Sequence, residues 1–357
     1  MRKVPSSRVT IGDVAKACSL AVSTVSNALS GKPYVRKETR RKVQEAADRL
    51  SYRPSAVAQA LRTSRSSTIG VLVPDITNPV FSWMVRGIDD VLFREGRSLF
   101  VCSTEGREDK QIQYMHALID RQVDGLILIS QHTHGDDIEA ILDNGPPFVL
   151  IHRRRRGHKE DYVGIDNDAG MRLAMNHLVE LGHRRIAFIR GPTTSTSVEE
   201  RFGAYRTVIA EARLAAEANL VFQGDYTIEG GMQAGKFLLE QVPRPTAILA
   251  ANDFSALGVI EAAMRLGFRV PEDVSVIGYD DIFIARMPQV QLTTVYQPKR
   301  DIGGAAATQL LRRIGALRRG RPKEVIFPVE LHVRATTAPA YSGSRVGPWE
   351  QDEVLVP

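Results

Sequence analysis

The chain lacks the features that mark secreted and membrane proteins. Its 357 residues contain two cysteines, Cys18 and Cys102, too few for the bridges of a disulfide-stabilised secreted domain. No stretch approaches the ~20 consecutive apolar residues of a membrane-spanning helix, and Met1–Ser7 has no apolar core of a signal peptide. We therefore expect a cytoplasmic protein with no membrane partner, in which both cysteines are small core residues.

Motifs of the common enzyme classes are also missing. The sequence contains no G-x-x-x-x-G-K-[ST] phosphate loop, no G-x-G-x-x-G turn after a predicted strand, no nucleophile elbow and no histidine-rich metal spacing. These absences predict a protein that is not an enzyme and holds neither a cofactor nor a metal ion. One alternative stays open, a sugar-handling α/β enzyme with a basic arm.

Positive charge is concentrated at the N-terminus. Residues 1–65 contain 14 Lys and Arg against 4 Asp and Glu, whereas the rest of the chain contains 33 against 37. The net charge of +6 therefore combines a strongly basic head with a mildly acidic body. Such an asymmetry indicates that the head binds nucleic acid.

Short amphipathic helices are predicted in the head, at residues 11–18, 22–29 and 36–50. Thr10 is expected to cap the first helix, with Asp13 near its positive end. The predicted core residues are Val14, Ala17, Val25, Leu29, Val43, Ala46, Ala47 and Leu50. Two short helices joined by a tight turn and braced by a third are the plan of a helix-turn-helix DNA reader.

From Ile69 onward, short β-branched runs alternate with helix-length amphipathic segments, a pattern typical of a doubly wound parallel α/β sheet. Strands are predicted at 69–73, 98–102, 125–129, 148–151, 185–189, 220–222, 247–250 and 274–279. Helices are predicted at 81–94, 110–121, 135–144, 168–181, 198–212, 228–241 and 253–266. Two such halves in tandem predict a cleft, because open α/β sheets bind ligands beyond the carboxyl ends of their strands.

Several short motifs occur in order along the chain. They are Val9-Thr10-Ile11, Asp13-Val14-Ala15, Val22–Ser26, Tyr52-Arg53-Pro54, Val73–Pro79, Gly191-Pro192, Arg201 with Gly203, Ala251-Asn252-Asp253 and Val276–Asp281. Together they resemble bacterial transcription regulators of the lactose-repressor and galactose-repressor type, the LacI/GalR family. The resemblance implies an all-α helix-turn-helix head and a periplasmic-binding-protein-like α/β body of two doubly wound parallel-sheet subdomains.

The same resemblance implies a ligand-responsive repressor that binds a pseudo-palindromic operator as a homodimer, in some members as a tetramer. Its effector is a small sugar, sugar acid or related metabolite. The implied organisation is a DNA-binding domain at 1–54, a hinge helix and linker at 55–68, an effector-binding and dimerisation domain at 69–340 and a loose tail at 341–357. The subdomains of the body are expected at about 69–165 with 296–324 and at about 166–295 with 325–340.

By resemblance, the residues that contact bases are Val22, Ser23 and Asn27. Their chemistry is suitable, because Val22 can touch a thymine methyl and Asn27 can form two hydrogen bonds to adenine. Local packing of Val22 and a phosphate contact of Asn27 remain the alternatives. Phosphate contacts are assigned to Thr10, Ser26, Lys32, Arg36, Lys37, Arg40, Arg41 and Arg62. The segment 57–61 matches the hinge helix, and Leu61 matches the residue that wedges into the minor groove.

The head departs from the family pattern at two positions. Ser19 stands where the family commonly has glycine, which costs about 1 kcal/mol if the backbone is left-handed there. Ala21 stands where a serine usually caps the second helix, so about 1 kcal/mol of capping is lost unless Ser23 or Thr24 compensates. We therefore expect a head of marginal stability in isolation.

For the effector, the resemblance assigns Val80, Phe81, Asp166, Ser195, Ser197, Arg201, Asn252 and Asp280. A carboxylate, a guanidinium and an amide together suit vicinal hydroxyls or a sugar acid. The alternatives are that Arg201 and Asp280 form a structural ion pair and that Phe81 is a core residue. Val80 departs from the family, which often has an aromatic residue there, so ring stacking with a ligand is in doubt.

Two further segments carry expectations. The run 153–156 is four arginines after a predicted strand, and we expect a solvated surface loop rather than a second nucleic-acid patch. Residues 293–298 resemble the family's return crossing, so the chain to about residue 321 is expected to rejoin the first half. Residues 327–334 are then expected to cross back to the second half, so that three crossings of the chain form a hinge.

Overall fold

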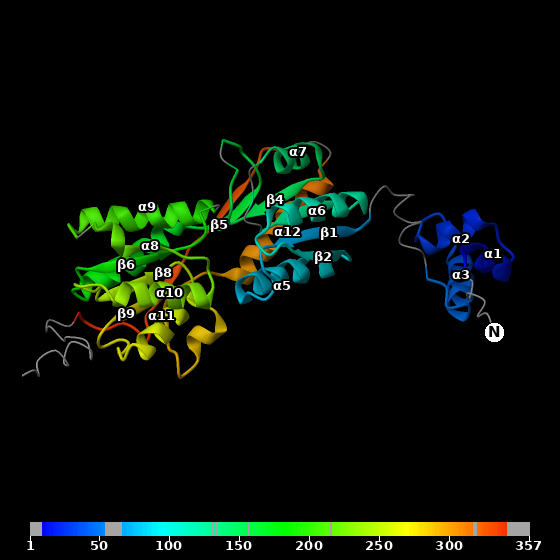
Figure 1. The fold of residues 1–357 in the computed structure, drawn as a ribbon. Coiled ribbons are helices and arrows are strands. Elements are labelled where there is room, and N and C mark those ends of the chain that lie inside the picture. Colours follow the sequence, from blue (N-terminus) through cyan, green and yellow to red (C-terminus); the bar gives the residue numbers. More distant parts are fainter. Residues whose placement is uncertain are drawn as a thin grey trace, which may run out of the picture. The chain divides into compact units, whose positions relative to one another are not determined.

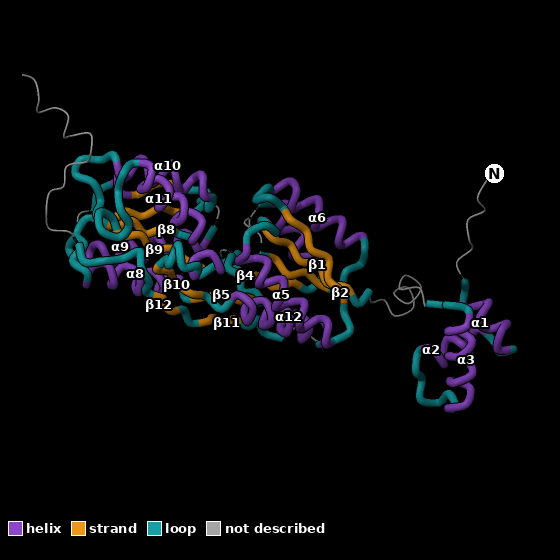
Figure 2. The backbone as a smooth tube through the Cα atoms, turned by 90° about the horizontal axis from the view of Figure 1, so that it is seen from below, coloured by secondary structure: helices purple, strands orange, loops and turns teal. Residues whose placement is uncertain are grey.

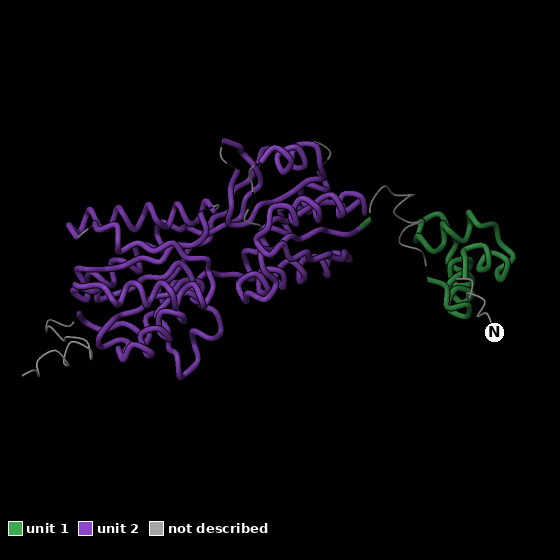
Figure 3. The backbone as a smooth tube through the Cα atoms, viewed as in Figure 1, with its two compact units in different colours: residues 1–66 green, residues 67–357 purple. Residues whose placement is uncertain are grey.

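The computed structural model describes residues 9–53, 66–129, 132, 135–155, 157–193, 195–214, 216–316 and 320–340. Residues 1–66 and 67–357 form two compact units (Figure 3). The hinge residues Leu61 and Arg62, and the tail at 341–357, lie outside the described residues. In the described chain, no helix combines the length and apolar character needed to cross a bilayer.

Over its described residues, 9–53, the head has three helices (Figure 1), as predicted. Their bounds are α1 (Ile11–Cys18), α2 (Val22–Leu29) and α3 (Lys37–Arg49). Thr10 and Asp13 form a reciprocal capping box at the start of α1, in which the Thr10 amide donates to the Asp13 carboxylate over 2.9 Å.

The core of the head is small and made of short side chains. Its buried residues are Val14, Ala15, Cys18, Val25, Ala28, Val43, Ala46 and Ala47. The predicted inward position of Ala17 is wrong, because Ala17 is exposed and Cys18 takes its place on the buried face of α1. Leu29 and Leu50 are half-buried and pack against this core.

Both departures at the turn between α1 and α2 have structural consequences. Ser19 ends α1 with a φ of 55°, in the left-handed region that favours glycine. Ala21 is the N-cap of α2, and no side chain donates or accepts a hydrogen bond there. Neither Ser23 nor Thr24 compensates for the missing cap.

The body contains two six-stranded sheets with the same strand arrangement. The first has the order β11-β5-β4-β3-β1-β2, and its pairs are parallel. Its strands are β1 (Thr68–Val73), β2 (Ser98–Ser103), β3 (Gly125–Leu128), β4 (Phe148–Ile151), β5 (Tyr162–Ile165) and β11 (Glu324–Phe327). Its helices are α5 (Pro79–Arg94), α6 (Glu108–Asp120), α7 (Asp136–Asn144) and α12 (Lys299–Gly315).

The second sheet has the order β12-β10-β9-β8-β6-β7 and is parallel except at its β10–β12 edge. Its strands are β6 (Ile186–Arg190), β7 (Val221–Gln223), β8 (Ala247–Ala250), β9 (Ser275–Asp280), β10 (Thr293–Tyr296) and β12 (Glu330–His332). Its helices are α8 (Asn167–Glu180), α9 (Thr196–Glu211), α10 (Ile228–Leu239) and α11 (Asp253–Arg265), with short 3-10 turns at Ala218–Leu220 and Phe283–Arg286.

Helices cover both faces of the first sheet (Figure 2). Val71 faces the cluster that includes Met84 and Ile88 of α5, whereas the next residue, Leu72, faces the cluster that includes Met115 of α6. This alternation is the period of a strand buried on both sides. The predicted doubly wound fold is confirmed.

The chain passes between the sheets three times. It leaves β5 for α8, returns from β10 to α12, and leaves β11 for β12. The chain stays paired in the first sheet through Phe327, beyond the predicted end of the first subdomain at about residue 324. Strands β5, β10, β11 and β12 were not predicted as strands. Their length of three or four residues is not by itself the cause, because β4 and β8 also have four residues and were predicted.

Restoring the cap of α2 is expected to stabilise the head. In Ala21→Ser the new hydroxyl oxygen can accept a hydrogen bond from a backbone amide in the first turn of α2, which stabilises the helix by about 1 kcal/mol. Hydrogen exchange of α2 amides in the full chain is then expected to slow about fivefold. Ala21→Val adds bulk without an acceptor and serves as the control. Equal exchange in Ala21→Ser and the parent chain would contradict the assignment of a missing cap.

Candidate functional site

The outward face of α2 presents apolar and polar groups side by side. Val22 is 48% exposed, so about half of its side chain is accessible to a partner. Ser23 beside it is also exposed, and Ser26 and Asn27 are half-buried. The residues predicted to contact bases therefore share one accessible face, opposite buried Val25.

Basic side chains surround this face. Lys32, Arg36, Lys37 and Arg41 are exposed, and Arg41 lies 3.9 Å from Glu45 one turn along α3. Arg40 is different, because its Nη2 donates to the backbone carbonyl of Lys32 over 3.0 Å. Arg40 thus braces the loop between α2 and α3. The Thr10 hydroxyl is committed to the capping box of α1.

In the body, a second group of polar residues is buried at the carboxyl ends of the strands. We call it the polar cluster. Its buried members are His152, Arg153, Arg201, Asn252, Asp280, Tyr279 and Gln297, and the partly buried Tyr226 lies with them. They come from the ends of β4, β8, β9 and β10, from the loop after β7 and from α9. This is the edge at which open α/β sheets bind ligands.

Asp280 ends β9 in a strained conformation. Its φ is 113°, and Asp281 follows with a φ of 50°, both in the region that favours glycine. The Asp280 side chain accepts a hydrogen bond of 2.6 Å from the Gln297 amide. Burial raises its pKa to about 6, although Arg201 and Lys299 act in the opposite direction. Asp280 therefore holds a carboxylate where hydroxyl donors would find a strong acceptor.

Arg201 is fixed by neutral partners. Its Nε donates to Asn167 over 2.9 Å and its Nη1 to the Ala251 carbonyl over 2.7 Å. The guanidinium lies 3.6 Å from the centre of the Tyr279 ring. Within the described residues no ion pair joins Arg201 to Asp280, so the alternative of a structural ion pair between them is wrong.

Both polar groups of the Asn252 side chain form hydrogen bonds within the fold. Its Oδ1 caps α11 by accepting from the Ser255 amide over 3.0 Å, and its Nδ2 donates to the Tyr226 carbonyl over 2.9 Å. The ring of Tyr226 lies over Gly191, where a Cβ would come within 2.1 Å of it. Asn252 and Gly191 together therefore hold Tyr226 in the cluster.

The neighbouring Asp253 is fully buried and fully bonded. It accepts from the Ile282 amide over 2.8 Å and from the Thr294 hydroxyl over 2.5 Å. Burial, with Asp280 nearby, raises its pKa well above the usual range. Asp253 therefore fixes the loop after β9 instead of offering a free carboxylate to a ligand.

The remaining predicted effector residues lie at the start of α9, at the start of α8 and in or against the hydrophobic core. Ser195 and Ser197 are buried at the start of α9, and the Ser197 hydroxyl donates to the His152 carbonyl over 2.8 Å. Asp166 is exposed and caps α8 through the Ala169 amide over 2.9 Å. Val80 is in the hydrophobic core, and Phe81 is half-buried against it, in line with the alternative that Phe81 is a core residue.

The prediction for the four-arginine run is wrong. Arg153 is 6% exposed and Arg155 2%, so neither lies in a solvated loop. Arg155 is paired with Asp143 at 2.9 Å and with Glu160 at 3.1 Å. The cause is the position of the run, since it starts two residues after the carboxyl end of β4. That position was a usable signal, because ligand sites lie beyond such ends.

Sequence reasoning also missed His152, Tyr226, Tyr279 and Gln297. Burial keeps the pKa of His152 well below its usual range, so its ring is neutral. Both ring nitrogens of His152, the Tyr279 hydroxyl and Gln297 Oε1 are buried without a hydrogen-bond partner. Unpaired buried polar atoms are costly, and their concentration in one place indicates a site for a polar ligand.

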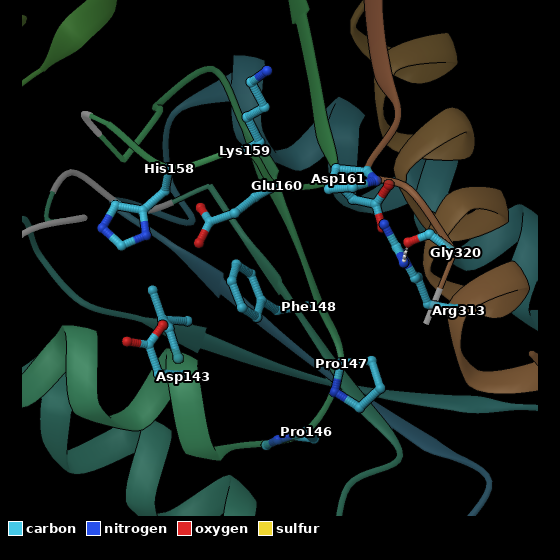
Figure 4. A pocket seen from close by; sticks show the side chains of 12 residues that line it. Asp143, Pro146, Pro147, Phe148, His158, Lys159, Glu160, Asp161, Arg313 and Gly320 are labelled. Carbon is cyan, nitrogen blue, oxygen red and sulfur yellow. Dashed lines mark hydrogen bonds and ion pairs between the residues drawn. The ribbon is translucent and has the colours of Figure 1, made fainter. Parts of the chain in front are cut away.

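A cavity in the first subdomain lies elsewhere. Its volume is about 410 Å³, and Pro146, Pro147 and Phe148 line it with the charged Asp161 and Arg313 (Figure 4). Phe148 is the first residue of β4, so the cavity is at the amino end of that strand. Asp161 and Arg313 bond to each other, and Glu160, which also lines the cavity, is paired with Arg155 at 3.1 Å. Glu160 Oε2 is buried without a hydrogen-bond partner, but it is an acceptor with a cation already beside it.

Comparison with known proteins gives consistent matches. Residues 10–55 match the family described as bacterial regulatory proteins, lacI family, and residues 175–337 match the periplasmic binding protein-like domain. The HTH-type transcriptional repressor PurR of Aliivibrio salmonicida is 34% identical over 306 residues, 85% of this chain and 92% of that protein. The ribose operon repressor of Escherichia coli is 36% identical over 307 residues, 85% and 93% of the two chains.

Solved structures agree. The lac repressor dimer bound to operator and the anti-inducer ONPF has 30% identity and a TM-score of 0.83, covering 93% of this chain and 99% of that one. A transcriptional regulator CelR–cellobiose complex has 31% identity and a TM-score of 0.71, covering 92% and 100%. The likeness therefore includes the head and the body.

The raised pKa of Asp280 predicts a pH-dependent stability. Between its ordinary pKa of 3.8 and about 6, the folded state keeps a proton that the unfolded chain has lost, so the free energy of unfolding falls as pH rises through this window. Asp280→Asn is expected to lack this fall and to exceed the parent above pH 6 by an amount on the order of 2 kcal/mol.

Urea unfolding at a series of pH values between 4 and 8 measures this difference. Asp120 has an exposed carboxylate and provides the control. Asp120→Asn is expected to show the same pH dependence of the free energy of unfolding as the parent chain. If Asp280→Asn and the parent have parallel pH profiles, Asp280 does not carry the raised pKa.

Proposed function

Because this chain belongs to the lacI family of bacterial regulatory proteins, we propose that it is an effector-responsive repressor that binds a pseudo-palindromic operator as a homodimer. It acts on DNA in the cytoplasm. The family is one of transcriptional regulators, so the alternative of a sugar-handling enzyme is set aside. Operator binding by the lac repressor dimer supports the dimeric state.

The observation that carries this proposal is the exposed face of α2. Val22 leaves nearly half of its surface in solvent, beside the hydroxyl of Ser23 and one turn before Asn27. In the major groove these groups meet a thymine methyl, several base edges and the paired donor and acceptor of adenine. The eight-residue helix α2 presents this short set of contacts along one face.

The surrounding basic residues bind phosphates. Lys32, Arg36, Lys37 and Arg41 are exposed, and contacts of this kind fix the register of the head without reading sequence. Ser26, Thr10 and Arg40 are proposed contacts with smaller roles, since the last two already have intramolecular partners. Arg62 and the minor-groove wedge Leu61 complete the proposed DNA surface.

The effector binds in the polar cluster. Asp280 accepts from its hydroxyls, and Arg201, Asn252 and Ser195 with Ser197 line the site. Val80, Phe81 and Asp166 are retained as outer members. Related regulators with a bound sugar, such as one from Enterococcus faecium with bound ribose, support a carbohydrate-like effector.

Control of DNA binding is a population shift between closures of the body. The chain passes between the two sheets at three places, and closure around a ligand changes the angle between the sheets there. A ligand shifts operator affinity by its differential affinity for the two closures.

The DNA proposal predicts different defects for Asn27→Ala and Arg36→Ala. Asn27→Ala is expected to lose about 1–3 kcal/mol of discrimination at one operator position, because a base contact is removed. Arg36→Ala is expected to weaken all sequences about equally and to lower the salt slope by about 1. Binding of the selected operator and its single-base variants at several salt concentrations measures both.

Gln44→Ala is a matched control on the exposed part of α3, since the Gln44 amide bonds within its own helix to Asp48. Uniform weakening by Asn27→Ala would remove it from the base-reading set. Binding that does not depend on salt or sequence in the parent chain would contradict the proposed function itself.

The effector proposal predicts that Asp280→Ala loses the response to ligand. A thermal-shift screen of sugars, sugar acids, sugar phosphates and purines identifies a responding compound, since ligand at 100 times its Kd stabilises by about 2.7 kcal/mol. Asp280→Ala is expected to remove most of that stabilisation, because its hydroxyl acceptor is lost. A full response in Asp280→Ala would exclude Asp280 from the site.

A further inference from the structure

Three neighbouring arginines follow β4, and two of them have carboxylate partners. Arg155 is paired with Asp143 and Glu160. Arg154 is half-exposed, is paired with Glu324, and lies 3.8 Å from the centre of the Tyr162 ring. These two side chains therefore have structural roles that explain their presence.

Arg153 has no such explanation. It is 6% exposed, and its Nε is buried without a hydrogen-bond partner. Among the described residues no carboxylate lies within ion-pair distance of it. Burial lowers the pKa of Arg153, yet a guanidinium stays protonated in proteins. A buried cation without a counter-charge is among the most costly groups in a fold.

The guanidinium of Arg153 belongs to the polar cluster. Tyr226, Arg201, Tyr162 and Asp280 all act on its charge, so these groups are its electrostatic neighbours. Its neighbour His152 is anchored there by the Ser197 hydroxyl, which donates to the His152 carbonyl over 2.8 Å. The first sheet thus contributes a cation to a cluster that otherwise comes mostly from the second.

Positive charge exceeds negative charge in this cluster. Arg201 bonds to an amide oxygen and a backbone carbonyl, not to a carboxylate. Asp280 is one carboxylate against two guanidiniums, and one of its oxygens already accepts from Gln297. The nearby Lys299 ammonium adds positive charge, since the acceptors of its hydrogen bonds are the neutral backbone carbonyls of Asp280, Asp281 and Gln297. The carboxylates of Asp280, Asp281 and Asp253 act on this ammonium in the opposite sense.

We propose that Arg153 is the anion-binding residue of the effector site, and that the effector is a polyhydroxylated anion, a sugar acid or a sugar phosphate. This inference rests on the proposed function only in taking the polar cluster as the effector site. A guanidinium binds a carboxylate or a phosphate through two parallel hydrogen bonds. The unpartnered Tyr279 hydroxyl, Gln297 Oε1 and His152 nitrogens are the matching partners of hydroxyl groups.

Neutral sugars do not fill this role. A neutral ligand would leave Arg153 without a counter-charge while excluding the water that reaches it, so the complex would bear a higher electrostatic cost than the free protein. The anionic group of the effector removes that cost. Specificity for the anion over its neutral parent therefore arises from one residue, Arg153.

The first test needs no knowledge of the effector. Arg153→Gln removes an unpaired buried charge, so in chloride buffer its Tm is expected to exceed that of the parent chain by at least about 2 °C. Arg154→Gln removes a paired arginine and is the matched control, with an expected Tm equal to or below that of the parent. A lower Tm for Arg153→Gln would show a structural role and overturn the proposal.

The second test uses inorganic phosphate and sulfate as probes at constant ionic strength. Both are expected to raise the Tm of the parent chain and of Arg154→Gln. The gain is expected to be lost in Arg153→Gln and partly kept in Arg153→Lys, which retains the charge but not the paired geometry. Equal stabilisation of the parent and Arg153→Gln would mean a general salt effect and would overturn the proposal.

Matched compounds then separate the two sources of the anion. Glucose, gluconate and glucose 6-phosphate are compared in competition with inorganic phosphate, together with their ribose counterparts. Displacement by a carboxylate or by a phosphate member supports the proposal and identifies the group, whereas displacement by the neutral member alone overturns it. Salt-dependent operator binding is measured on the same samples, so that failure of the DNA-binding function is detected separately.

Discussion

Strand direction is the constraint on which the body of this protein depends. Parallel strands place all of their carboxyl ends at one edge of a sheet, and the two sheets of this chain have the same strand order. The residues that follow β4, β8 and β9 therefore gather without being near in sequence. Loops at that edge can then bear polar groups, because the strands behind them provide a nearly continuous apolar core.

Much of this arrangement could be predicted from the sequence. Long amphipathic helices and buried β-branched strands gave a clear period, so the two-sheet body and the three-helix head agree with expectation. Arg201 and Asp280 were assigned by resemblance to family motifs and are buried in one cluster. Thr10 and Asp13 form the expected cap, because capping depends on residues three positions apart.

The parts that could not be predicted depend on long-range packing. Nothing local distinguishes Arg153 from Arg154, yet one is buried without a partner and the other is paired across the fold with Glu324. Composition favoured a solvated loop for both. Short strands such as β11 are fixed by pairing with β5 rather than by their own four residues. The prediction for Ala17 was wrong because the buried face of α1 continues from Val14 to the residue four positions on, Cys18, instead of the residue three positions on.

One close contact in the body has a mechanical consequence. The backbones of α5 and α12 touch where Gly87 and Gly303 lie, and a Cβ at either position would come within about 2 Å of the other helix. At the start of α12, Lys299 bonds to the backbone carbonyls of Asp280 and Asp281. Displacement of the strained end of β9 is therefore transmitted to α12 and, through the backbone contact, to α5. These two helices can then move together as one rigid body.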